Sequence, residues 1–141
     1  MTKNFGLFLL VCLWLSSGLM AQTPSPEAIA ASIERGQGVY QTHCQACHRR
    51  QGQGLGKKFP PLAQSDYLLT DPDRAVRVIW YGLAGPITVN GRAYDKAMAP
   101  VALTTQEVAD VMNYVLHAWG NQGPLIDTVR VQAAVERGPV E

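Results

Sequence analysis

Apolar residues recur at helical spacing in three stretches of the chain. In the first, Ser25 is a good helix N-cap and Pro26 occupies the first helical position, which predicts a helix over residues 26–43. Its apolar face consists of Ile29, Ile33, Gly36 and Tyr40. Gly36 and Gly38 would each cost about 1 kcal/mol in a helix interior. We therefore expect either that at least one of them allows the close approach of another backbone or that the helix end frays there.

The second and third stretches have clear starting signals. Asp71 is an N-cap in front of a proline and predicts a helix over residues 71–81. Its apolar positions are Ala75, Val76, Ile79, Trp80 and Leu83. Thr104 and Glu107 form a capping box that predicts a helix over residues 104–119. The apolar positions of this third helix are Val108, Val111, Met112, Val115, Leu116 and Trp119.

The other segments have weaker patterns. Residues 49–62 are rich in glycine and proline and predict a loop, and a short helical turn is expected around residues 65–69. Residues 87–95 contain an Asn-Gly dipeptide that would suit a hairpin, but we expect an extended loop there. Residues 122–141 are weakly helical near 129–137, and we expect them to wrap the surface or fray.

The start of the chain has the composition of a secretory signal peptide. Lys3 precedes an apolar run over residues 5–15, and small residues then lead to a predicted cleavage site after Ala21. The apolar run is too short to span a bilayer comfortably, and Cys12 lies inside it. We therefore expect three parts: a signal peptide over residues 1–21, one small domain over 22–121 and a C-terminal extension over 122–141.

Overall charge points to no polyanionic partner. The chain has 12 Lys and Arg against 11 Asp and Glu, and Lys3 is the only charged residue of the leader, so the mature chain is neutral. This balance gives no indication of nucleic-acid binding. The exception is local, because the loop after residue 48 contains the four basic residues Arg49, Arg50, Lys57 and Lys58. This basic loop is either an ordinary solvated surface or a docking patch for an acidic partner.

The strongest chemical signal is the C-x-x-C-H motif formed by Cys44, Cys47 and His48. Two thiols at this spacing can add across the two vinyl groups of a haem, and the next imidazole then lies under the iron. We expect Cys44 and Cys47 to be the tethers of one covalent haem c and His48 to be its proximal ligand. A redox disulfide would need a βαβ context, and structural zinc would need a fourth ligand at a suitable spacing. Neither is indicated by the sequence.

A second axial ligand must then be chosen. Outside the leader there are two methionines, and Met112 falls on the apolar face of a predicted helix, where core packing explains it. Met98 lies in an irregular segment where core packing does not. His43 is too close to the tethers, and His117 follows an apolar residue near a helix end. We therefore predict that Met98 is the distal ligand.

Residues 33–121 resemble the class I c-type cytochromes, and most of all the small bacterial monohaem domains. The matching motif is Gly36-x-x-x-Tyr40-x-x-x-Cys44-x-x-Cys47-His48, followed by Pro60-Pro61-Leu62 and by Met98. The resemblance implies that the Pro60 carbonyl orients the His48 ring and that Leu62 packs on the haem. It also implies that Val111 and Tyr114 cross the first helix at Gly36 and Tyr40. One departure is Ala99, which intervenes where relatives have proline directly after the ligand methionine.

Together these features predict an all-α, class I cytochrome c fold with three main helices and short turns around a covalent haem c. The resemblance implies a periplasmic electron carrier rather than an enzyme, whose haem has His48 and Met98 as ligands. The expected partners are redox proteins, namely a dehydrogenase, a nitrite reductase or a terminal oxidase, with the membrane reached only through a partner complex. The alternative is a five-coordinate haem enzyme or a gas or redox sensor, which would have a distal His, Arg or Trp in place of Met98.

Overall fold

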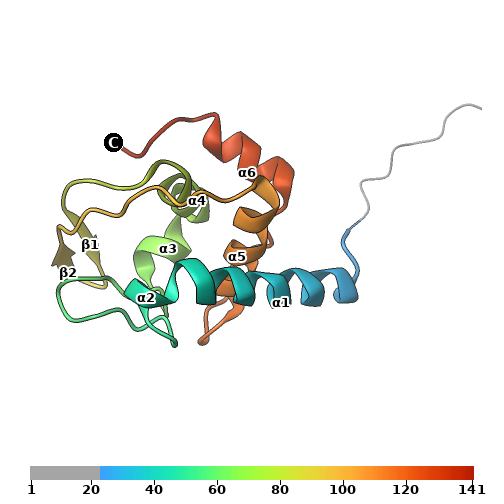
Figure 1. Cartoon of the computed structure of the whole chain (residues 1–141), viewed down its shortest axis with the longest axis horizontal. Coiled ribbons are helices and arrows are strands. Elements are labelled where there is room, and N and C mark those ends of the chain that lie inside the picture. The colour runs from blue at the N-terminus through green and yellow to red at the C-terminus, as the bar shows by residue number, and fades with distance from the viewer. Residues whose placement is uncertain (1–22) are drawn as a thin grey trace, which may run out of the picture.

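The computed structural model describes residues 23–141, so the predicted signal peptide lies outside the described residues. Over this range the chain forms six helices and one two-stranded hairpin (Figure 1). In chain order they are α1 (Pro26–His43), α2 (Gln45–His48), α3 (Asp66–Thr70), α4 (Pro72–Tyr81), β1 (Ile87–Val89), β2 (Arg92–Tyr94), α5 (Thr105–His117) and α6 (Thr128–Val135). The architecture is mostly helical, as the sequence predicted. Within the described range, none of the helices is long and apolar enough to span a membrane.

The three main helices begin where their capping residues predicted. The side chain of Ser25 accepts a hydrogen bond from the Ala28 amide, and that of Asp71 accepts one from the Arg74 amide. Thr104 and Glu107 form the complete, reciprocal capping box. Each of these caps satisfies an amide that the first turn of a helix leaves without a partner.

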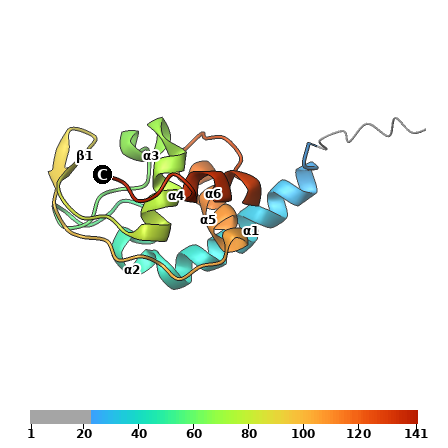
Figure 2. The same ribbon diagram turned by 90° about the horizontal axis from the view of Figure 1, so that it is seen from above.

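The centre of the fold is the crossing of α1 and α5, which lie side by side in Figures 1 and 2. At the crossing, a methyl group on Gly36 would overlap the carbonyl oxygen of Asp110 and lie 2.9 Å from Cβ of Tyr114. Gly36 therefore allows the close backbone approach expected of one of the two glycines. Gly38 faces open space. The core beside this crossing is formed by Tyr40, Val108, Val111, Met112, Val115 and Leu116.

The expectation of an extended loop over residues 87–95 is wrong. β1 and β2 pair antiparallel, with Val89 opposite Arg92, around a turn at Asn90 and Gly91. Both turn residues have positive φ, 49° and 73°, as a two-residue hairpin requires. The turn is also fixed from outside, because Asp66 accepts a hydrogen bond from the Asn90 amide and the Asn90 side chain accepts one from the Asp66 amide.

The C-terminal segment also differs from the expectation that it wraps the surface or frays. α6 packs against α4 and α5, and Figure 2 shows it lying beside both. Ile126, Val131 and Ala134 are buried members of the same core as α5. The apolar pattern of α6 is weak because polar contacts also hold this short helix in place, so few apolar side chains are needed.

The crossing gives a matched pair of tests. Gly36→Ala should lower the free energy of unfolding by about 1–3 kcal/mol or more, because the added methyl group forces the two helices apart. Gly38→Ala should raise it by about 0.5–1 kcal/mol, because alanine is the better helix former and nothing opposes its methyl group. Denaturant unfolding of both variants measures the difference. Equal effects at the two positions would contradict the close approach at Gly36.

Candidate functional site

One large apolar cavity lies between α2, α4, α5 and the hairpin. Its volume is about 550 Å³, within the range of about 300–1,000 Å³ that is usual for sites that bind organic ligands and cofactors. Every site residue expected from the sequence lines this one cavity: Cys44, Cys47, His48, Pro60, Leu62 and Met98. Residues up to 54 positions apart in the chain are thus brought together by the fold.

The two thiols lie where α1 ends and α2 begins. Cys44 is the C-cap of α1 and the residue before α2, and Cys47 is one helical turn further on. As a free thiol, Cys44 has its pKa raised to about 11, first by burial and then by the neighbouring Cys47. Redox-active cysteines have the opposite property, a lowered pKa that makes the thiolate available. The raised pKa of Cys44 is therefore not the property expected of a redox-active thiol.

His48 is the last residue of α2, and its ring is held by the loop that follows. Its Nδ1 lies 3.0 Å from the carbonyl oxygen of Pro60. Because a carbonyl can only accept, Nδ1 carries the hydrogen and Nε2 keeps its lone pair. Burial lowers the pKa of His48, although the hydrogen bond to Pro60 opposes this shift. The ring is thus a neutral, oriented base, which is the form that binds metals.

The loop between His48 and Pro60 is fixed by contacts with both helices of the crossing. The hydroxyl of Tyr40 donates a 2.6 Å hydrogen bond to the carbonyl of Arg49. Gly52 packs against the ring of Trp119, just beyond α5, and its carbonyl accepts a hydrogen bond from the Leu62 amide at 2.7 Å. These contacts place the Pro60 carbonyl and the Leu62 side chain beside the cavity.

Met98 lies in the segment that follows the hairpin. Its backbone pairs with Leu83 through two hydrogen bonds of 2.9 Å, and the Val101 amide donates to the carbonyl of Ile79 at the same distance. The inserted Ala99 is exposed and does not prevent this pairing. Met112 also lines the cavity, but it is 1% exposed and belongs to the core, as expected.

The two histidines set aside on sequence grounds have different surroundings. His117, at the end of α5, is not among the residues that line the cavity, and its Nδ1 contacts the carbonyl of Asn113 at 2.8 Å. His43 lines the cavity, but it directly precedes Cys44 on the same wall.

Sequence reasoning missed the contribution of the hairpin. Ile87, Val89 and Tyr94 line the cavity, and Tyr94 is only 6% exposed. The signal that could have found them was the apolar alternation on either side of the Asn-Gly turn.

The family model of cytochrome c matches residues 33–119. The chain belongs to the cytochrome c family. This assignment confirms the class I cytochrome c fold, the electron-transfer domain and the covalently bound haem c that the sequence predicted.

Several relatives are named cytochromes. Cytochrome c-552 of Thermus thermophilus is 39% identical over 83 residues, which cover 55% of this chain and 63% of that protein. The alcohol dehydrogenase (quinone) cytochrome c subunit of Gluconacetobacter polyoxogenes is 34% identical over 117 residues, covering 78% of this chain and 22% of that protein. The corresponding subunit of Gluconobacter oxydans is 37% identical over 89 residues, with 61% of this chain and 18% of that protein covered. The chain thus spans less than two thirds of the Thermus protein and about a fifth of the dehydrogenase subunits.

The residues of the cavity fit a haem c. Its walls are mostly apolar, as a porphyrin requires, and two thiols one helical turn apart lie on one wall for thioether bonds. The structure does not offer ligands for a metal ion bound by side chains alone, because residues 23–141 contain no group of three or more His, Cys, Asp or Glu arranged to hold one. The cavity is therefore suited to a large apolar group that brings its own metal.

Covalent attachment can be tested by mass. The protein from a host able to mature c-type cytochromes should carry one haem that survives acid and organic extraction. Cys44→Ala and Cys47→Ala together should abolish it, because no other thiol of residues 23–141 lines the cavity. Cys12→Ala is the control and should leave the mass of the purified protein unchanged, since residue 12 is expected to be removed with the leader. Intact-protein mass spectrometry measures the haem content of the unmodified protein, the double variant and the control. Retention of haem by the double variant would contradict the two-thioether attachment.

Proposed function

We propose that the chain is a periplasmic one-electron carrier whose haem has His48 as proximal and Met98 as distal ligand. The observation that carries this proposal is that the oriented neutral imidazole of His48 and Met98, whose backbone is paired with Leu83, line the same apolar cavity. When bound, haem c supplies an iron that changes oxidation state by one electron. Histidine and methionine together favour the reduced state and raise the potential.

The residues around the cavity support a carrier rather than an enzyme. Pro60 holds the His48 ring by its Nδ1 hydrogen, which fixes the tautomer and the orientation of the ligand. Leu62, Ile79, Val111 and Val115 present apolar surface that excludes water from the site. The proposed Met98 thioether would occupy the position that a substrate or gas needs in a five-coordinate enzyme or sensor.

The proposed location and partner rest on different observations. The leader-like composition of residues 1–21 supports export to the periplasm. The relatives named as cytochrome c subunits of alcohol dehydrogenase (quinone) support a dehydrogenase as the electron donor. We propose that this chain accepts electrons from such a donor and passes them to a respiratory acceptor.

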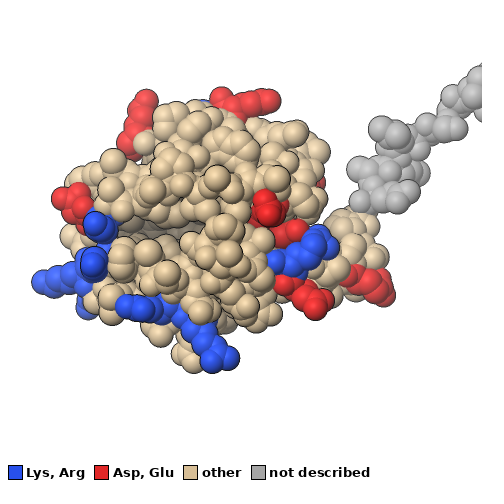
Figure 3. Space-filling view, viewed as in Figure 1, with Lys and Arg blue, Asp and Glu red and all other residues tan. Residues whose placement is uncertain are grey.

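The basic loop is the proposed contact for an acidic partner. Arg49, Arg50, Lys57 and Lys58 are all exposed, and Phe59, which follows them, lines the cavity. Figure 3 shows Lys and Arg side chains gathered along the left and lower sides of the molecule, while most Asp and Glu lie along the top and right. With this separation of charges, a mature chain of zero net charge has a local positive field that can steer an anionic surface toward the haem.

The distal ligand is tested by comparing the two methionines. Met98→Ala should remove the methionine-to-iron charge-transfer band at the red edge of the visible spectrum, lower the potential and allow carbon monoxide to bind the reduced protein readily. Met112→Leu should leave all three unchanged and cost less than about 1.5 kcal/mol of stability, as a swap of similar volume. The reverse pattern would identify Met112 as the ligand. Rapid carbon monoxide binding by the unmodified protein would favour the five-coordinate enzyme or sensor.

The basic loop is tested with small oxidants of opposite charge. Changing Lys57 and Lys58 to Gln should slow oxidation of the reduced protein by anionic hexacyanoferrate(III) and speed oxidation by cationic tris(phenanthroline)cobalt(III). Both differences should shrink toward 1 M salt, where the Debye length falls to about 3 Å. Stopped-flow kinetics measures the rates, and Glu34→Gln, on the exposed side of α1, is the control with a small effect. If the substitutions change neither rate, whatever the charge of the oxidant and the salt concentration, the loop is only a solvated surface.

A further inference from the structure

The two faces of α4 make different contacts, one with the cavity and the other with α6. Ala75, Val78 and Ile79 line the cavity from one side of this helix. On its other side, α4 packs against α6, and the two helices lie next to each other in both Figure 1 and Figure 2. α4 therefore connects the C-terminal segment of the chain to the wall of the site.

α6 and the residues after it hold α4 at its beginning and at its end. At the beginning, the carboxylate of Asp73 accepts hydrogen bonds from Arg130 Nε and from Arg137 Nη2, each 2.6 Å long. At the end, the hydroxyl of Tyr81 donates to the carbonyl of Val135 at 2.9 Å. Burial raises the pKa of Asp73, but the hydrogen bonds from the two arginines outweigh it and the net pKa is lowered. The carboxylate is therefore charged at neutral pH.

The end of α4 that Tyr81 fixes is also the end that holds the Met98 segment. The carbonyl of Ile79 accepts from the Val101 amide, and Leu83 pairs with Met98 in both directions. Between them, a methyl group on Gly82 would lie 2.7 Å from the carbonyl oxygen of Met98, so the two backbones are in tight contact. A shift of the end of α4 must therefore move the backbone of Met98.

From these contacts we infer that α6 is a positioning element for the distal side of the site. The hydrogen bonds of Asp73 and Tyr81 with α6 fix the position of α4, and α4 in turn keeps the Met98 segment closed over the cavity. This inference rests on the proposed function for the ligand role of Met98, but the holding of the segment can be measured separately. Asp73 and Tyr81 do not line the cavity themselves, so they act through α4 and are not ligands.

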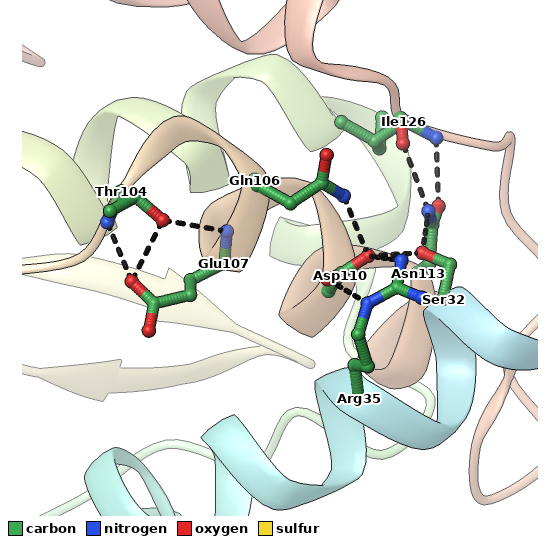
Figure 4. A network of polar contacts seen from close by, with 8 residues as sticks. All are labelled: Ser32, Arg35, Thr104, Gln106, Glu107, Asp110, Asn113 and Ile126. Carbon is green, nitrogen blue, oxygen red and sulfur yellow. Dashed lines mark hydrogen bonds and ion pairs between the residues drawn. The ribbon is translucent and has the colours of Figure 1, made fainter.

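The test uses four variants: two that weaken the contacts between α4 and α6, one conservative rescue and one control. Asp73→Asn and Tyr81→Phe remove contacts between α4 and α6, and Asp73→Glu is the conservative rescue that keeps the carboxylate. Arg35→Gln is the matched control, because Arg35 forms an ion pair of 2.7 Å with Asp110 that joins α1 to α5 (Figure 4). Urea unfolding gives the global stability of each variant, so that local and global effects can be separated.

Two readouts report on the Met98 segment in the haem-loaded protein. Native-state hydrogen exchange at the amides of Met98 and Val101 measures how often the segment opens. The affinity of the ferric protein for imidazole measures how often the distal position is free. One lost hydrogen bond shifts such an opening equilibrium by about threefold to tenfold. The exchange rates of the two amides and the affinity for imidazole should therefore rise by that factor in Asp73→Asn and Tyr81→Phe.

The outcomes distinguish the two proposals. Faster exchange with tighter imidazole binding in both variants, wild-type values in Asp73→Glu and unchanged values in Arg35→Gln would support the inference. The inference would be overturned if, at equal global stability, the amides of Met98 and Val101 exchange no faster in Asp73→Asn and Tyr81→Phe than in Arg35→Gln. If exchange accelerates but the charge-transfer band survives Met98→Ala, α6 still holds the segment and only the ligand role of Met98 fails.

Discussion

The close contact of α1 and α5 at Gly36 is the constraint on which the rest of the structure depends. It decides where α1 delivers Cys44 and how α5 presents Val111 and Val115 to the cavity. A polar network secures the same crossing: Asp110, whose side chain is only 3% exposed, accepts hydrogen bonds from Ser32, Arg35 and Gln106 (Figure 4). Burying a carboxylate is costly unless its oxygens are satisfied, so this network favours one register of the two helices.

The same crossing reaches the proximal side of the site through aromatic side chains. Tyr40 of α1, Tyr114 of α5 and Trp119 form a cluster with ring centroids 5.1–5.4 Å apart. Tyr40 then bonds the carbonyl of Arg49, and Trp119 packs against Gly52. The loop that brings the Pro60 carbonyl to His48 is thus built on the helix crossing. A loop of this length without regular structure keeps a single conformation because its backbone groups find such partners.

The two sides of the cavity are stabilised in different ways. Cys44, Cys47 and His48 are neighbours in sequence, so on the proximal side these three residues are brought together by one helical turn, and only the orientation of the His48 ring depends on the loop built on the helix crossing. Met98 reaches the cavity through pairing with Leu83, and α4 in turn is held by the ion pairs of Asp73 with Arg130 of α6 and with Arg137 just after it. The distal side therefore depends on contacts between distant parts of the chain, and we expect it to open at lower free energy than the proximal side.

Much of the fold was predictable because its signals are local. Caps at Ser25, Asp71 and Thr104 act within one helical turn, and they set the starts of the three main helices correctly. For the hairpin the local signal, an Asn-Gly dipeptide between apolar residues, was present but did not decide between a hairpin and a loop. Its turn is fixed by hydrogen bonds with Asp66, which lies 24 residues away, and two three-residue strands have little stability without such support. For α6, the decisive contacts with Asp73 are more distant still, since Arg130 lies 57 residues and Arg137 lies 64 residues from Asp73.

The sequence by itself determined the chemistry of this protein: the C-x-x-C-H motif identifies the cofactor because three reactive side chains within five residues need no fold to be close together. Only the tertiary structure decided how the cavity is closed. Both methionines line it, and the backbone pairing of Met98 with Leu83, the wall contributed by Tyr94 and the hold of α6 on α4 arise from packing between distant segments. Such contacts depend on which surfaces the helices bury against one another, and no local pattern of residues specifies that choice.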